Sequence, residues 1–193
     1  MKNLSQNTDN ELVKAFNEGN NRALEILIDR YKDKLFSTIL FLVKDKYLAE
    51  DLFQDTFIKI IDTIRNNRYT EEGKFLPWAM RIAHNLCVDH FRKAKRKPAV
   101  ITSDDVNFFE VYSFNEETTD KKLIQDQTNV WVRKVLNRLP EEQREVVVLR
   151  HFGDLSFKEI SEITNSSLNT CLGRMRYGLI NIRRLVSDET TAL

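Results

Sequence analysis

The sequence predicts an all-α fold of two small helical domains joined by an acidic linker. Three observations support this fold class. Apolar residues recur at helical spacing along most of the chain, no segment alternates apolar and polar residues as a strand would, and only 5 Gly and 3 Pro occur among 193 residues. The helical periodicity fails at residues 98–119, which separates domain 1–97 from domain 120–193.

Composition is that of a globular protein, with 41% hydrophobic and 31% charged residues. No segment has 18 uncharged apolar residues, and the first seven residues lack the apolar core of a signal peptide. We therefore expect a cytoplasmic protein without membrane insertion. Cys87 and Cys171 form no CxxC pair, so buried thiols are expected. The net charge of +1 argues against a protein that holds DNA tightly by itself.

In chain order, Thr8 or Asp9 can cap a short helix over residues 10–18, and Asn20 can cap a longer one over 21–43. A third helix is expected over residues 47–64, with an apolar stripe that must face a core. Its opposite face carries Asp51, Gln54, Asp55, Ile58 and Asp62. This face is either a solvated acidic surface or a protein-binding surface with Ile58 as an apolar anchor.

A polar loop over residues 65–74 precedes a helix that begins near Phe75. The outward face of this helix carries Trp78, Arg81, Asn85, Asp89, Arg92 and Arg96. Basic residues with an aromatic ring and an amide suit nucleic acid, although the cationic end of the helix is also explained by its macrodipole. His84, Cys87 and His90 rotate around the axis without a fourth ligand nearby, so no metal site is predicted.

Residues 98–119 contain five carboxylates and no Lys or Arg. This acidic segment is either a tether or a linker that lets two DNA-reading domains occupy separate elements. Fully extended, it could span about 70 Å.

Three helices are expected in the last domain, after a helix that follows Asp120. The first of them runs from Glu141 to His151 and is stopped by Gly153. The second begins at a capping box of Ser156 and Glu159, and Ser167 caps the third. Two short helices joined by a polar turn form a helix-turn-helix, whose second helix fits a DNA major groove.

The third of these helices has an apolar side expected to face the core, which carries Leu168, Cys171, Met175, Ile182, Leu185 and Val186 with Gly178 and Leu179 beside them. Asn169, Gly173, Arg176, Tyr177 and Arg184 lie opposite, with Thr170 and Leu172 at the flanks. By itself this helix could be an ordinary amphipathic surface helix. The capped two-helix context favours DNA recognition.

Four segments carry a resemblance to a known family: residues 49–57 (AEDLFQDTF), 78–86 (WAMRIAHNL), 139–146 (LPEEQREV) and 157–160 (FKEI). In this order they resemble the extracytoplasmic-function sigma factors, which direct bacterial RNA polymerase to promoters. The resemblance implies two helical domains, regions 2 and 4, without catalysis, cofactor or metal. It implies core RNA polymerase and promoter DNA as partners, and an anti-sigma factor as a frequent one.

The resemblance also implies a role for each surface. Asp51, Gln54, Asp55 and Ile58 match the surface for the polymerase clamp. The loop at 66–74 with Trp78, Arg81 and Asn85, and the basic Arg92 and Arg96 beyond them, match the part that melts and binds the −10 element. Ser167, Asn169, Thr170, Leu172, Gly173, Arg176 and Tyr177 match the −35 reader. The acidic linker resembles the segment that follows the RNA path of the polymerase.

This chain departs from many relatives at Leu172 and Gly173, where a basic residue and a serine are usual, and at Asn165, where a glycine is usual in the turn. Asn tolerates the left-handed conformation, so the turn should survive. Fewer polar groups on the reading helix favour contact with a thymine methyl or recognition of DNA shape. A free-standing helix-turn-helix regulator is the alternative function, and a helical adaptor that binds only protein is a third. The former would bind duplex DNA without polymerase.

Overall fold

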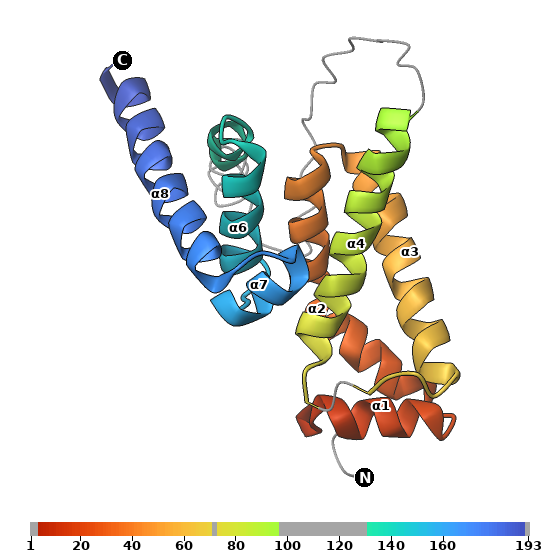
Figure 1. Cartoon of the computed structure of the whole chain (residues 1–193). Coiled ribbons are helices and arrows are strands. Elements are labelled where there is room, and N and C mark those ends of the chain that lie inside the picture. The colour runs from red at the N-terminus through yellow and green to blue at the C-terminus, as the bar shows by residue number, and fades with distance from the viewer. Residues whose placement is uncertain (1–3, 71–72, 97–130, 192–193) are drawn as a thin grey trace, which may run out of the picture.

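The computed structural model describes residues 4–70, 73–96 and 131–191, and every regular element in these ranges is helical (Figure 1). The predicted linker at 98–119 and the first part of the helix expected after Asp120 lie outside the described residues. The described elements are η1 (Leu4–Gln6), α1 (Asp9–Asn17), α2 (Asn21–Val43), α3 (Lys46–Arg65), α4 (Phe75–Arg96), a helical segment at 131–137, α6 (Glu141–His151), α7 (Phe157–Thr164) and α8 (Leu168–Thr191).

Polar side chains cap the first three α-helices, and the caps of the first two are those that the sequence predicts. Thr8 and Glu11 form a reciprocal capping box at α1, and the Asn20 side chain accepts from the Arg22 amide at α2. Asp45 caps α3 by accepting from the Leu48 amide at 2.9 Å. Each cap satisfies an amide that the helix itself leaves without an acceptor.

Helices α2, α3 and α4 form a bundle, and α1 crosses one end of it (Figure 1). Each helix gives its apolar stripe to a shared core, in which the side chains of Leu12, Leu27, Leu35, Ile39, Ile60, Ile64, Phe75 and Met80 are fully buried. Burying one such side chain contributes about 1.5–3 kcal/mol, so this core fixes how the outward faces of α3 and α4 are presented.

In the second unit, α6 and α7 pack against α8. Ser156 and Glu159 form the predicted capping box at α7, and the predicted left-handed residue, Asn165, has φ of 52°. The end of α6 differs from the expectation in one respect. The left-handed residue there is Asp154, with φ of 55°, whereas Gly153 is needed because a Cβ would lie 2.6 Å from the Leu149 carbonyl oxygen.

The two units contact each other through α2 with α6 and α4 with α7. The Phe41 ring packs on Phe152 with ring centroids 4.2 Å apart. Lys34 forms an exposed ion pair with Asp154 at 2.8 Å. The described helices therefore pack together, and the outward face of α3 lies away from α6, α7 and α8 (Figure 1).

Candidate polymerase and nucleic-acid interfaces

The acidic face of α3 is exposed as the sequence predicts. Burial of Ala49, Leu52 and Ile60 on the core side turns Asp51, Gln54 and Asp55 to solvent. The four residues expected to contact polymerase, Asp51, Gln54, Asp55 and Ile58, are all exposed. Ile58 is 56% exposed among the carboxylates. An apolar side chain rimmed by charge is suited to a protein partner with a basic rim and an apolar pocket.

The expected −10 face on α4 is only partly open. Trp78 is half-buried, and its ring packs against Tyr69 and Phe75 with centroids 4.6 and 5.7 Å away. The indole that the sequence places on the outward face is thus partly covered. Its aromatic group joins Tyr69 of the connection between α3 and α4 to Phe75 and Trp78 of α4.

Farther along α4, the basic residues differ in accessibility. Arg81 is half-buried and its guanidinium lies 3.5 Å from a carboxylate oxygen of Glu162 in α7. Asn85, Arg92 and Arg96 are exposed, and Arg92 lies 3.7 Å from Asp89 on the same helix. The structure therefore leaves the second half of the predicted face open, while α7 occupies part of the first half.

His84 has a role that the sequence did not indicate. Its imidazole Nε2 lies 2.7 Å from the Glu145 carboxylate of α6, and both groups lie at the contact between the two units. His84 is buried, as is Cys87, and burial raises the pKa of the Cys87 thiol to about 12. No grouping of three potential metal ligands occurs in the ranges that the structure describes.

The recognition helix α8 presents the predicted −35 residues on its first turns. The Ser167 hydroxyl caps the helix by accepting from the Thr170 amide at 3.0 Å. Six of the seven predicted residues are exposed: Ser167, Asn169, Thr170, Leu172, Arg176 and Tyr177. The seventh, Gly173, is half-buried, but a Cβ built there would meet nothing within 4 Å. A bare helix surface at this position lets the backbone approach a base edge closely.

The apolar side of α8 is less buried than the sequence predicts. Leu168 is 47% exposed and Leu179 is 43% exposed, although both were expected on the core side. Helices α6 and α7 pack against α8 and leave part of its apolar stripe uncovered. Part of that stripe lines a groove of about 470 Å³ formed by Phe157, Leu172, Met175, Arg176, Leu179, Ile180 and Arg183.

Comparison with protein families gives two matches that coincide with these units. Residues 27–97 match the family model for Sigma-70 region 2, and residues 129–175 match the model for Sigma-70 region 4. The ECF RNA polymerase sigma factor SigW of Bacillus subtilis is 31% identical over 186 residues, which cover 91% of this chain and 95% of SigW. The chain belongs to the extracytoplasmic-function sigma factors.

Other relatives agree with this sigma factor assignment. The RNA polymerase sigma-H factor of Pseudomonas aeruginosa is 29% identical over 89% of this chain and 90% of its own length. Among solved structures, CnrH in complex with the cytosolic domain of CnrY has a TM-score of 0.67 at 20% identity, covering 94% of this chain and 99% of that chain. RpoE in complex with the anti-sigma factor NepR, from Bartonella quintana, has a TM-score of 0.62 at 19% identity, covering 85% of this chain and 96% of that chain. These two structures confirm the fold.

Family membership decides among the functions that the sequence left open. This sigma factor is a non-enzymatic, polymerase-associated initiation factor, and neither a free-standing regulator nor a protein-only adaptor. None of the helices in the described ranges combines the length and apolarity that crossing a bilayer requires.

Proposed function

We propose that this sigma factor binds core RNA polymerase through α3 and reads promoters through α4 and α8. The observation that carries the proposal is the exposed first part of α8, held by the Ser167 cap behind the left-handed Asn165. This geometry presents a short polar surface to a major groove, as a recognition helix does. Its residues in the −35 role are Ser167, Asn169, Thr170, Leu172, Gly173, Arg176 and Tyr177.

The other two surfaces complete the assignment. The exposed carboxylates and Ile58 of α3 support polymerase binding by Asp51, Gln54, Asp55 and Ile58. Asn85, Arg92 and Arg96 have side chains free of the contact with α7, and we assign them to the −10 element together with Trp78 and Arg81. Basic side chains hold phosphates, and a group of aromatic rings beside them suits stacking with an unpaired base.

The domain boundaries in this proposal are residues 1–97 for the −10 and polymerase functions, 98–119 for the linker and 120–193 for the −35 function. Two solved structures of this fold are complexes, one of CnrH with the cytosolic domain of CnrY and one of the sigma factor RpoE with the anti-sigma factor NepR. We accordingly assign an anti-sigma partner to this chain as well, and the cytoplasm as its place of action, since that is where core polymerase works.

Run-off transcription from a promoter-fragment library tests the proposal, with core polymerase in the presence and absence of the protein. Protein-dependent initiation at a defined start site is expected. Arg176→Ala should lower initiation about tenfold on fragments with the preferred −35 element, because one specific base contact is worth about 1–3 kcal/mol.

Arg184→Ala is the matched control, since Arg184 is an exposed arginine of the same helix beyond its first turns. It should leave initiation within about twofold of wild type. Equal losses in both variants would indicate a general loss of positive charge and would remove α8 from −35 reading. Initiation that does not depend on the protein would overturn the proposed function as a whole.

A further inference from the structure

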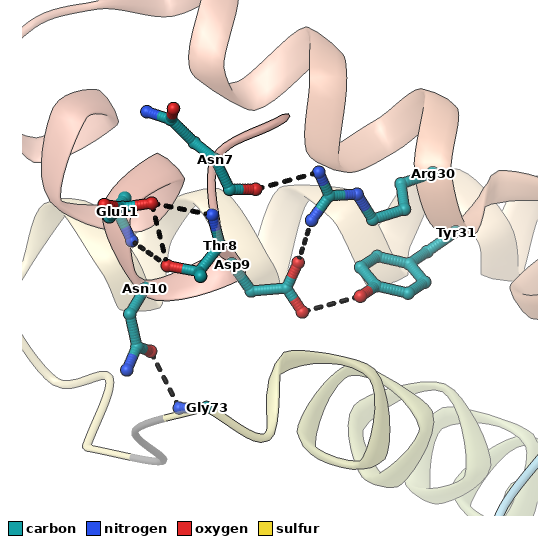
Figure 2. Close-up of polar contacts among 8 residues, drawn as sticks. All are labelled: Asn7, Thr8, Asp9, Asn10, Glu11, Arg30, Tyr31 and Gly73. Atoms are coloured by element: carbon teal, nitrogen blue, oxygen red, sulfur yellow. Dashed lines mark hydrogen bonds and ion pairs between the residues drawn. The ribbon is translucent and has the colours of Figure 1, made fainter. Parts of the chain in front are cut away.

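Two asparagines of α1 contact opposite sides of the connection between α3 and α4. The Asn10 side-chain oxygen accepts from the Gly73 amide at 2.7 Å (Figure 2). The Asn17 side-chain amide donates to Oδ1 of Asn67 at 3.0 Å. Positions 10 and 17 are seven residues apart, about two helical turns, and so lie on one face of α1. A single helix therefore bonds to the connection near both of its ends.

The helix that carries these asparagines is itself held firmly. The Asp9 carboxylate accepts from the Arg30 guanidinium at 2.5 Å and from the Tyr31 hydroxyl at 2.6 Å, both on α2 (Figure 2). At the other end of α1, the buried Phe16 ring lies under the Arg65 guanidinium, 5.6 Å from the ring centroid. Anchored at both ends, α1 is a rigid support for Asn10 and Asn17.

The two connection residues in these hydrogen bonds have backbone conformations that most residues avoid. Asn67 has φ of 52° and Gly73 has φ of 75°, both in the left-handed region. A non-glycine residue there persists when its surroundings over-determine it, and such residues gather at functional sites. Tyr69 lies between them in sequence and packs on Trp78. Two hydrogen bonds from α1 thus hold the described part of the connection, in addition to the packing of Tyr69 on Trp78.

We propose that Asn10 and Asn17 are positioning residues for −10 recognition: they hold residues 66–70 and 73–74 of the α3–α4 connection beside Trp78, where these residues can contact single-stranded promoter DNA. The role rests on the proposed function, which assigns the adjoining Trp78 to the −10 element. The family-model match begins at residue 27, after α1, and therefore assigns no role to either asparagine. Holding the connection in advance lowers the conformational entropy that DNA binding must otherwise cost.

Binding of holoenzyme to a fluorescein-labelled single-stranded non-template oligonucleotide tests the proposal. Its −10 sequence is taken from the promoters found by run-off transcription, and affinity is read by fluorescence anisotropy. Asn10→Ala with Asn17→Ala should weaken binding about threefold to tenfold, the range of one to two net hydrogen bonds. Binding to a duplex −35 fragment, core polymerase binding and thermal unfolding should remain as in wild type.

Asn10→Asp provides the conservative rescue. A carboxylate oxygen can still accept from the Gly73 amide, and a negative charge near the start of α1 favours the helix. This variant should bind the −10 oligonucleotide within about twofold of wild type, whereas Asn10→Ala should not. Asn21→Ala is the matched control, an exposed asparagine in the first turn of α2, and it should also bind like wild type.

Two results would overturn the positioning role while leaving the proposed function intact. One is wild-type binding of the −10 oligonucleotide by the double variant. The other is a parallel loss of −35 binding and thermal stability, which would show that the asparagines only stabilise the fold. If wild-type holoenzyme does not prefer the −10 oligonucleotide to a scrambled one, the proposed −10 function itself fails, and the positioning role fails with it.

Discussion

Replacing Glu145 with alanine should separate the two helical units. Glu145 of α6 accepts a hydrogen bond from His84 of α4 at 2.7 Å, and the side chains are 23% and 7% exposed. Glu145→Ala removes the acceptor and leaves the buried imidazole without it. The other polar contacts between the units are more exposed, so this contact should dominate the equilibrium between packed and separated units.

The expected magnitude follows from burial. A hydrogen bond to a charged group contributes about 1.5–3 kcal/mol, equivalent to about 10-fold to 150-fold in the packed-to-separated ratio. The pair of Lys34 with Asp154 has side chains 40% and 68% exposed, and exposed pairs are typically worth about 0–1 kcal/mol. Asp154→Ala should therefore change the same ratio by no more than about fivefold.

Single-molecule energy transfer measures this ratio directly. Dyes can be attached through Lys59→Cys on α3 and Arg184→Cys on α8, both at exposed positions, because the native Cys87 and Cys171 are buried. Glu145→Ala should populate a low-transfer state that Asp154→Ala populates much less. An unchanged transfer distribution in Glu145→Ala, or equal shifts in the two variants, would show that the buried hydrogen bond does not hold the units together.

Three further predictions concern single sites. Ile58→Asp should weaken binding to core polymerase about tenfold or more in a pull-down titration. It should not lower the melting temperature, because the Ile58 side chain is 56% exposed. A melting temperature that falls together with the affinity would contradict this prediction. Gly178→Ala should be less stable than Gly173→Ala in urea unfolding by about 1–3 kcal/mol, because the Cβ at position 178 would lie 3.0 Å from a side-chain carbon and the Cβ at position 173 would meet nothing within 4 Å; equal stabilities would refute the assignment. Burial, then the hydrogen bond to Asp9, raises the pKa of Tyr31 to about 12, so the contribution of this hydroxyl to folding stability is complete below pH about 10 and is lost as pH rises toward 12. Tyr31→Phe should flatten this loss of stability at alkaline pH. An unchanged loss in the variant would show that Tyr31 is not its source.

Local signals predicted the helices of this protein well. Thr8, Asn20 and Ser156 each cap the helix that the sequence assigned to them, and the expected helix at 141–151 has the observed bounds. Asn165 adopts the predicted left-handed conformation. These features depend on contacts within about four residues, which a single sequence displays directly.

Contacts between distant segments could not be predicted in the same way. Glu145, the partner of His84, is 61 residues away in the chain. In the sequence, the only groups that could be considered together with His84 were Cys87 and His90 of the same helix, as metal ligands. The same limit applies to Asn10 and Asn17, which are unremarkable helix residues until the fold places the α3–α4 connection beside them.

The exposed side of α8 illustrates a different limit. Periodicity identified an apolar stripe, but how much of a stripe is buried depends on the width of the surface that covers it. Here α6 and α7 cover Cys171 and leave Leu179 43% exposed. The direction of the stripe was therefore predictable, and its burial was not.

The packed arrangement of the two units affects the proposed polymerase and DNA surfaces differently. The Arg81 guanidinium lies 3.5 Å from a carboxylate oxygen of Glu162 in α7, so in the −10 role proposed for Arg81 a DNA phosphate would compete with that carboxylate. The acidic face of α3 is exposed in the same arrangement and points away from α6, α7 and α8 (Figure 1). We therefore expect polymerase to bind the proposed α3 surface without separation of the units, whereas full use of the proposed −10 face requires the contact between α4 and α7 to open. A ligand shifts this equilibrium only by its preference for the separated units, so binding at α3 alone does not open the −10 face, whereas a polymerase surface that holds the two units apart would open it.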